Sequence, residues 1–274
     1  MNRRAFLLAS AASMLRGASG SHLKIGITDW NLEMTGRVEA VAMAKRLGFD
    51  GVQISLGRKL VDDQLPLDNP QLIAQYRAAS KREGIPIDST CLDRLHDDCL
   101  KSSGAAPKWV ADGIRITAAL GVRVMLLPLF FKCDVAPSEF DYVGSVLREL
   151  APDAEKAGVV LGLEDQLSAE DNVRIMELSK SDAAKVYYDV GNSTRWNHDV
   201  LREIAWLGRD RICQFHFKDN PHYLGEGNID FAKVLAAIRA IGFDGFANLE
   251  TDAPSHSVEA DLRRNLAFIR GLLG

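Results

Sequence analysis

Short runs of apolar and β-branched residues alternate with longer amphipathic segments from Leu23 to the end of the chain. This alternation is typical of strand–helix units whose strands form a parallel sheet. Eight runs have strand character: Lys24–Thr28, Gly51–Ser55, Ile85–Ser89, Val122–Leu127, Val159–Glu164, Lys185–Asp189, Ile212–His216 and Phe246–Glu250. Eight units in one series predict a single (β/α)8 TIM barrel domain over residues 23–274.

The segments between these runs have the period of amphipathic helices. Two of these amphipathic helices are traced by Val38, Val41, Ala42, Lys45 and Leu47, and by Phe231, Val234, Leu235, Ile238 and Ile241. The tetrapeptide Gly-Phe-Asp-Gly follows both segments, at 48–51 and at 242–245, which predicts the same helix-to-strand turn in units two and eight. The polar stretch Leu92–Pro107 is predicted to be a long loop over the mouth of the barrel.

The first twenty residues have a different pattern. Two arginines precede a short apolar stretch, and Ala18-Ser19-Gly20 then supplies small residues, which is the layout of an export signal. The segment Asn2-Arg3-Arg4-Ala5-Phe6-Leu7 resembles a twin-arginine signal. We therefore expect residues 1–20 to be a signal peptide recognised by the twin-arginine export machinery, and the mature protein to be periplasmic or exported, without a membrane segment. The alternative is an accidental basic start on a cytoplasmic protein.

Composition and charge limit the partners. The chain has 274 residues, of which 47% are hydrophobic and 26% charged, which is typical of a soluble domain. Removing residues 1–20 takes away three arginines and no acid, so the formal charge moves from −4 to −7. A chain of this charge is not expected to bind nucleic acid.

The four cysteines include no C-x-x-C pair. Cys91 and Cys99 lie close together in the sequence and could form a disulfide in an oxidising compartment, or both could remain free thiols. Cys213 lies inside a predicted strand, where a packing role is expected.

Four potential metal ligands end the last four predicted strands. Glu164, Asp189, His216 and Glu250 follow one another at intervals of 25, 27 and 34 residues, each about one strand, loop and helix long. A parallel barrel directs the carboxyl ends of its strands to one mouth, so these side chains are expected to converge. Three carboxylates and an imidazole suit a divalent cation, with oxygen-rich coordination favouring Mn²⁺ or Mg²⁺ over Co²⁺ or Zn²⁺.

Each of these residues also has an ordinary structural explanation. Asp189 could cap the turn through Gly191-Asn192, and Glu250 could form a salt bridge at the rim of the barrel. Four such residues at equivalent strand ends are harder to explain separately, because charged groups at the ends of apolar strands are costly unless they are paired or metal-bound.

At this point the sequence resembles the sugar phosphate isomerase/epimerase family of xylose isomerase-like TIM barrels. The resemblance extends over Leu23–Gly274 and is carried by Leu163-Glu164, Tyr188-Asp189-Val190-Gly191-Asn192, His216-Phe217-Lys218-Asp219, Leu224-Gly225-Glu226-Gly227-Asn228-Ile229-Asp230-Phe231 and Phe243-Asp244-Gly245. It implies that Glu164, Asp189, His216 and Glu250 bind a metal, and that Glu164 and Glu250 double as the acid/base pair. The family's second-strand acid is replaced by Gln53, and a histidine common in epimerases by Asn192.

The reaction implied by this resemblance is a sugar isomerisation or epimerisation through an enediolate. One carboxylate removes a proton next to a metal-bound carbonyl and the other returns it. Because sugar phosphates are scarce outside the cytoplasm, an exported 3-keto-glycoside lyase or hydrolase with the same metal site is the main alternative. An endonuclease IV-like enzyme is disfavoured by the charge and the single aligned histidine, and a non-catalytic sugar-binding barrel by the intact quartet.

Further residues are candidates for contacts with a small-molecule carbohydrate. Lys218 is suited to an oxyanion or a sugar hydroxyl, or simply to an ion pair with Asp219. Trp30 could stack on a sugar ring or belong to the barrel wall. His222 and His256 lie on loops after the last two strands, where substrate contacts gather, although solvated loop histidines are common. The sequence leaves open the sugar, the metal and whether the chain forms a homo-oligomer.

Overall fold

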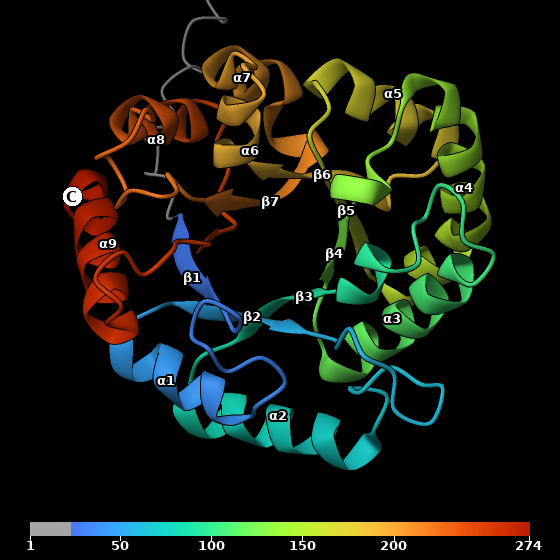
Figure 1. The fold of residues 1–274 in the computed structure, drawn as a ribbon, viewed down its shortest axis with the longest axis horizontal. Helices are drawn as coiled ribbons and strands as arrows, with labels where there is room; N and C mark the ends of the chain where they lie inside the picture. The colour runs from blue at the N-terminus through green and yellow to red at the C-terminus, as the bar shows by residue number, and fades with distance from the viewer. Residues whose placement is uncertain (1–22) are drawn as a thin grey trace, which may run out of the picture.

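A computed structural model describes residues 23–274 as a closed barrel of eight parallel strands in chain order, with helices around the outside (Figure 1). The strands are β1 (Lys24–Thr28), β2 (Gly51–Ser55), β3 (Ile87–Cys91), β4 (Val124–Pro128), β5 (Val160–Glu164), β6 (Ala184–Asp189), β7 (Ile212–Phe217) and β8 (Phe246–Leu249). The predicted (β/α)8 TIM barrel is confirmed. The predicted signal peptide, residues 1–20, lies outside the described residues.

Helices connect successive strands. They are α1 (Glu39–Leu47), α2 (Pro70–Glu83), α3 (Ala106–Leu120), α4 (Phe140–Ala157), α5 (Ala169–Ser179), α6 (Val190–Arg195), α7 (Val200–Arg211), α8 (Phe231–Ala240) and α9 (Val258–Leu273). Short 3-10 helices are formed by Asp93–His96, Phe131–Cys133 and Pro137–Glu139. Within the described residues, none of the helices combines the length and apolar character needed to span a bilayer.

Two strands begin later than the hydrophobic pattern predicts. β3 and β4 start at Ile87 and Val124, whereas the apolar runs start at Ile85 and Val122. Ile85 and Val122 are buried, but their N–H groups bond to Ser80 O and Thr117 O of the preceding helix. Apolarity at these two positions therefore reflects packing at the helix-to-strand turn instead of sheet pairing.

The repeated Gly-Phe-Asp-Gly turn occurs where it was predicted, before β2 and before β8. Gly48 and Gly242 have φ values of 97° and 69°, a left-handed conformation that glycine adopts without steric cost. The next residue is buried in both turns, Phe49 at 3% exposure and Phe243 at 6%. Both turns therefore end a helix with a left-handed glycine and fix the start of the next strand with a buried phenylalanine.

Strand alternation separates an apolar layer from a polar barrel interior. Leu161, Leu163, Phe215 and Phe217 belong to the hydrophobic core between the sheet and the helices. The alternate positions face inward, where hydrogen bonds cross the barrel, for example from Gln214 in β7 to Asp88 in β3. Glycine leaves space for this layer, because a Cβ on Gly26 would lie 1.8 Å from Asn248 Oδ1.

The segment predicted as a mouth loop, Leu92–Pro107, follows β3 and contains the 3-10 helix Asp93–His96, with α3 beginning at its end. A disulfide joins Cys99 in this segment to Cys133 after β4. The predicted pairing of Cys91 with Cys99 is therefore wrong, and so is the alternative in which both remain free thiols. Of these two cysteines, Cys91 is the free thiol; it ends β3 and is buried against Leu126 and Tyr187 inside the barrel.

Candidate metal centre

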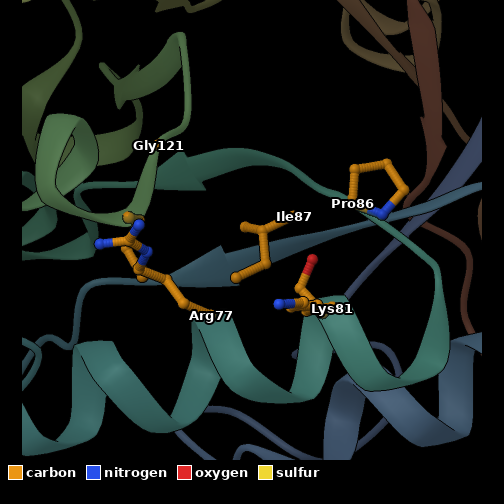
Figure 2. A pocket seen from close by; sticks show the side chains of 7 residues that line it. Arg77, Lys81, Pro86, Ile87 and Gly121 are labelled. Atoms are coloured by element: carbon orange, nitrogen blue, oxygen red, sulfur yellow. The ribbon is translucent and has the colours of Figure 1, made fainter.

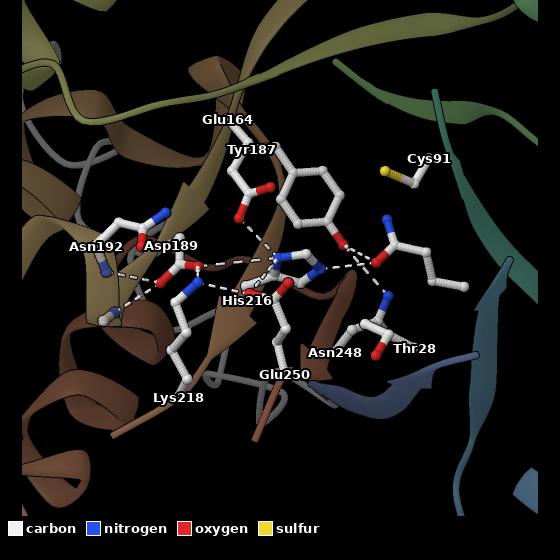
Figure 3. A network of polar contacts seen from close by, with 12 residues as sticks. Thr28, Cys91, Glu164, Tyr187, Asp189, Asn192, His216, Lys218, Asn248 and Glu250 are labelled. Atoms are coloured by element: carbon white, nitrogen blue, oxygen red, sulfur yellow. Dashed lines mark hydrogen bonds and ion pairs between the residues drawn. The ribbon is translucent and has the colours of Figure 1, made fainter. Parts of the chain in front are cut away.

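The structure brings the four predicted ligands together at the mouth of the barrel (Figure 3). Glu164 ends β5, Asp189 ends β6, His216 is the next-to-last residue of β7, and Glu250 directly follows β8. One potential ligand atom from each of these residues lies within 4.8 Å of the other three. Glu164, Asp189 and His216 are buried, whereas the side chain of Glu250 remains 21% exposed.

The imidazole of His216 occupies the middle of this quartet. Its Nδ1 lies 2.8 Å from Glu164 Oε1, 3.6 Å from Glu250 Oε2 and 3.9 Å from Asp189 Oδ2. Asp189 is oriented by its other oxygen, Oδ1, which accepts hydrogen bonds from the N–H groups of Gly191 and Asn192 at 2.7 and 2.9 Å. The turn-capping role considered for Asp189 is therefore present, and it leaves Oδ2 directed at the centre.

Lys218 forms ion pairs inside the site. Its Nζ lies 2.6 Å from Asp189 Oδ2 and 2.5 Å from Glu250 Oε2. Burial opposes the charge of this ammonium, but the surrounding carboxylates outweigh that effect and raise the pKa of Lys218 above its ordinary value. The alternative of a pair with Asp219 is wrong.

Asp219 instead organises the loop after β7. Its carboxylate accepts hydrogen bonds from the N–H groups of Gly225, Gly227 and Asn228. Gly227 packs so closely that a Cβ there would lie 2.2 Å from Asp219 Oδ1. The glycine-rich motif of this loop therefore matches the shape of a buried carboxylate.

The two glutamates have opposite electrostatic environments. Burial, reinforced by the charge of Glu250, raises the pKa of Glu164. Burial also opposes the ionisation of Glu250, but Lys218, His216 and the indole of Trp30 lower the pKa of Glu250 below its usual range. Two carboxyl groups with displaced pKa values in one site are suited to complementary acid and base roles.

The donor set fits a divalent cation. Two ligand atoms bound to one ion at roughly 2.0–2.2 Å lie at most about 4.4 Å apart, so the quartet, whose atoms lie within 4.8 Å of one another, needs to contract by at least roughly 0.4 Å at its widest. Three carboxylates and one imidazole are appropriate ligands for such an ion. Lys218 already shows that the pocket between Asp189 and Glu250 stabilises positive charge.

The remaining predicted contact residues separate into two groups. Trp30 belongs to the site: its Nε1 donates to Glu250 Oε1 at 3.1 Å, and its ring meets that of His216 edge-on with centroids 6.0 Å apart. His222 and His256 are exposed, and among the described residues neither side chain has a hydrogen bond or ion pair with the quartet. Their loops follow β7 and β8 as expected, and their role as substrate contacts stays a prediction.

Sequence reasoning missed the polar layer beneath the quartet. Gln53 Oε1 lies 2.7 Å from His216 Nε2, and Tyr187 and Asn248 continue the contacts across the barrel. A signal was available: Tyr187 and Asn248 stand two positions before Asp189 and Glu250, so each shares the inward face of its strand with a ligand.

A hollow of about 220 Å³ lies elsewhere, lined by residues that include Arg77, Lys81, Pro86, Ile87 and Gly121 (Figure 2). Pro86 precedes β3 and Ile87 begins it, so this hollow is at the amino end of the barrel. Chemistry in such barrels takes place at the carboxyl ends of the strands. The quartet is therefore the stronger candidate.

A family model described as xylose isomerase-like TIM barrel matches residues 41–272. The match begins within α1 and ends within α9, and it includes all four residues of the quartet. It covers more than half of the chain.

Curated and solved proteins resemble the chain at low identity. The 2-epi-5-epi-valiolone 7-phosphate 2-epimerase of Actinoplanes sp. is 27% identical over 228 residues, 79% of this chain and 82% of the relative. A crystal structure of D-psicose 3-epimerase in the presence of D-fructose has a TM-score of 0.77 at 16% identity, covering 92% of this chain and 100% of that one. The 3-keto-D-glucoside 4-epimerase from E. coli has a TM-score of 0.73 at 19% identity, covering 91% and 99%. At such identities the solved structures show a common fold.

Proposed function

The chain belongs to the xylose isomerase-like TIM barrel family, and we propose that it is a divalent-metal-dependent sugar isomerase or epimerase. The observation that carries the proposal is the convergence of three carboxylates and one imidazole at the carboxyl ends of neighbouring strands. The similar proteins described above are named as epimerases, which supports the same class of reaction.

The quartet Glu164, Asp189, His216 and Glu250 would hold the cation. Mn²⁺ is the first choice from the oxygen-rich donors, with Mg²⁺, Co²⁺ and Zn²⁺ as alternatives. The bound cation would supply Lewis-acid stabilisation of the negative charge that develops when a proton leaves the carbon next to a carbonyl.

The chain's own residues supply the proton transfers. Glu250, held ionised by Lys218 and Trp30, is the first base: its carboxylate takes the proton from carbon, and the C–H electrons move toward the carbonyl. Glu164, the second carboxyl of the pair, returns a proton to carbon. The outcome is an isomer or an epimer according to which carbon atom, or which face of it, receives the proton.

Lys218 and Trp30 are the proposed substrate contacts. The ammonium is 18% exposed next to both Asp189 and Glu250, where it can also receive a hydroxyl or a developing oxyanion of a sugar. The indole of Trp30 is partly exposed beside Glu250, where an aromatic face can pack against the apolar face of a sugar ring.

A second candidate is an exported lyase or hydrolase of 3-keto-glycosides with the same site. The disulfide between Cys99 and Cys133 favours it, because disulfides persist mainly in oxidising compartments, where sugar phosphates are scarce. With a carbonyl at C3, removal of the proton at C2 by the same carboxylate allows the electron pair to expel the anomeric substituent.

The decisive experiment combines metal analysis of the purified mature protein with a substrate screen. Free ketoses, ketose phosphates and 3-keto-glucosides are incubated with the Mn²⁺-loaded protein, and the products are resolved by NMR. Interconversion of sugars supports the isomerase or epimerase. Release of the aglycone without interconversion would reverse the ranking, and a protein that neither binds metal nor turns over any of these sugars would refute both.

The proposed location is the periplasm, reached through the twin-arginine export machinery. The support is the arrangement of residues 1–20 together with the disulfide in the mature domain. Replacing Arg3 and Arg4 by lysine should keep the protein in the cytoplasm of an expressing bacterium, as measured by cell fractionation. Unchanged export of this variant would contradict the twin-arginine route.

A further inference from the structure

We infer that a directional chain of hydrogen bonds across the barrel fixes the tautomer of His216, so that the lone pair of its Nδ1, and not a proton, is directed toward the three carboxyl groups. The chain runs from Asp88 through Asn248, Tyr187 and Gln53 to His216. The residues come from β3, β8, β6, β2 and β7, so the chain crosses the barrel interior below the quartet. Gln53 is its last member and the positioning residue for the imidazole.

The direction originates at Asp88. Its Oδ1 accepts hydrogen bonds from Ser89 Oγ at 2.7 Å, Gln214 Nε2 at 2.7 Å and Asn248 Nδ2 at 2.9 Å. A carboxylate oxygen that receives several donors offers no proton of its own. The amide of Asn248 must therefore present its NH₂ group, and not its oxygen, to this end of the network.

The same NH₂ group also donates to the hydroxyl of Tyr187. Asn248 Nδ2 lies 3.2 Å from the hydroxyl oxygen of Tyr187, which accepts there. The hydroxyl proton is then free for Gln53 Oε1, which lies 3.4 Å away. Figure 3 shows Tyr187 and Asn248 on the side of His216 that faces away from Lys218.

The orientation of the Gln53 amide determines which nitrogen of His216 carries the proton. It is fully buried, and its Oε1 receives Tyr187 and faces His216 Nε2 at 2.7 Å. An amide oxygen only accepts, so the proton of the imidazole lies on Nε2. Nδ1 then carries the lone pair, and in the metal-free protein it accepts the proton of the Glu164 carboxyl across 2.8 Å; a cation needs the same lone pair for coordination.

The opposite tautomer would place a proton between Nδ1 and the carboxylates and block coordination by that atom. Partners that orient a ligating histidine in this way typically change metal affinity by about 10–100-fold when they are removed. Gln53 stands where the resembling family has an acid, so the amide retains the accepting oxygen while removing a buried charge.

This inference rests on the proposed function only where Mn²⁺ affinity is measured, because the tautomer of His216 can be measured without metal. The first measurement therefore uses the metal-free full-length mature protein: ¹⁵N NMR of the imidazole assigned to His216 should show a protonated Nε2 and an unprotonated Nδ1. In Gln53→Leu, which offers no acceptor, the proton should move to Nδ1 and Mn²⁺ affinity, measured by titration calorimetry, should fall about 10–100-fold. Gln53→Glu, which retains an accepting oxygen, should keep the Nε2 proton.

Tyr187→Phe keeps the ring and removes only the hydroxyl that orients Gln53, so it provides a second test if Gln53→Leu does not fold. It should populate both tautomers and lower Mn²⁺ affinity. Tyr76→Phe is the matched control, because Tyr76 is equally buried and its hydroxyl has no hydrogen-bond partner in the described residues. A wild-type His216 protonated on Nδ1, or unchanged tautomer and affinity in both test variants, would overturn the inference. Absence of Mn²⁺ binding with the Nε2 tautomer present would instead refute the proposed function.

Discussion

At the scale of single residues, the site shows how environment separates two side chains of the same type. Glu164 and Glu250 both end strands of one barrel, yet Glu250 contacts Lys218 and Trp30 whereas Glu164 contacts His216. The cationic partner favours ionisation of one carboxyl, and burial favours protonation of the other. The different environments of the two carboxyl groups therefore depend on neighbours that the strand pattern alone does not reveal.

Glu164→Gln and Glu250→Gln should each abolish turnover while leaving the fold intact. An amide of the same size cannot exchange the proton, and general acid–base steps typically contribute roughly 10²–10⁴-fold to rate. Steady-state rates and circular dichroism of both variants check this. Glu226→Gln is the control, because Glu226 lies on the loop after β7 and pairs with Arg264 at the surface. Wild-type rates in both test variants would remove the assignment.

Asp29 should make the unfolding free energy depend on pH. Burial raises its pKa from 3.8 to about 7, although N–H groups of Ser55 and Gly36 bond to the carboxylate. Because the folded state holds this proton more tightly than the unfolded state, the contribution of Asp29 to stability is fully present below about pH 4 and is lost as pH rises through about 7.

Asp29→Asn should therefore match the wild type at pH 4 and become more stable than it by pH 8, by up to about 4 kcal/mol. Urea unfolding at several pH values measures the difference. Asp182→Asn, which makes the same substitution at an exposed position, provides the control. A difference between Asp29→Asn and the wild type that stays constant from pH 4 to pH 8 would disprove the argument.

The convergence of the four candidate ligands could be predicted from sequence because strand period and unit spacing together determine which side chains meet at the mouth. The partners of those four side chains could not. Lys218 lies two positions after His216 in the sequence, and only the relative placement of β6, β7 and β8 shows that it bridges Asp189 and Glu250. The exposure of His222 and His256 likewise depends on loop paths, which the strand pattern does not determine.

At the scale of elements, strands were easier to predict than the connections between them. The bounds of β1 and β2 match the apolar runs, whereas those of β3 and β4 shift because buried turn residues have the same composition as strand residues. The pairing of Cys99 with Cys133 links two connections 34 residues apart, and their proximity depends on tertiary packing. The local sequence around each cysteine does not indicate how close the two connections lie in space.

Removing the disulfide should destabilise the domain without displacing the quartet. In the chain-entropy account, a closed loop of this length stabilises by roughly 3–4 kcal/mol. The double variant Cys99→Ala, Cys133→Ala should lose about that amount in urea unfolding and keep its Mn²⁺ affinity. Cys213→Ala, which removes a free thiol, is the control. Equal stability of the wild type and the double variant would show that the link contributes nothing measurable.

At the scale of the whole molecule, the barrel could be predicted because every unit repeats the same pattern of an apolar strand followed by an amphipathic helix. The eight runs, the turns between them and the amphipathic helices all agree on one closed sheet, which is the consistency that specifies a fold. The quartet occupies only part of that sheet, because its members come from β5 to β8. Beyond the strand ends, local patterns place no constraint on the polar layer that crosses from those strands to β2 and β3.

Because four strands contribute ligands, binding of one cation should stabilise the whole barrel. The folded state alone assembles the quartet, so a concentration of 100 times the dissociation constant should add about 2.7 kcal/mol to the unfolding free energy. For a domain of this size, we expect Mn²⁺ to raise the melting temperature of chelator-treated protein by roughly 5–10 °C, as measured by calorimetry. The rise should grow with the logarithm of the metal concentration and disappear in His216→Asn, whose amide side chain provides no imidazole lone pair. An equal rise in His216→Asn and the wild type would place the binding outside the quartet, and no rise in either would show that the converging side chains hold no cation.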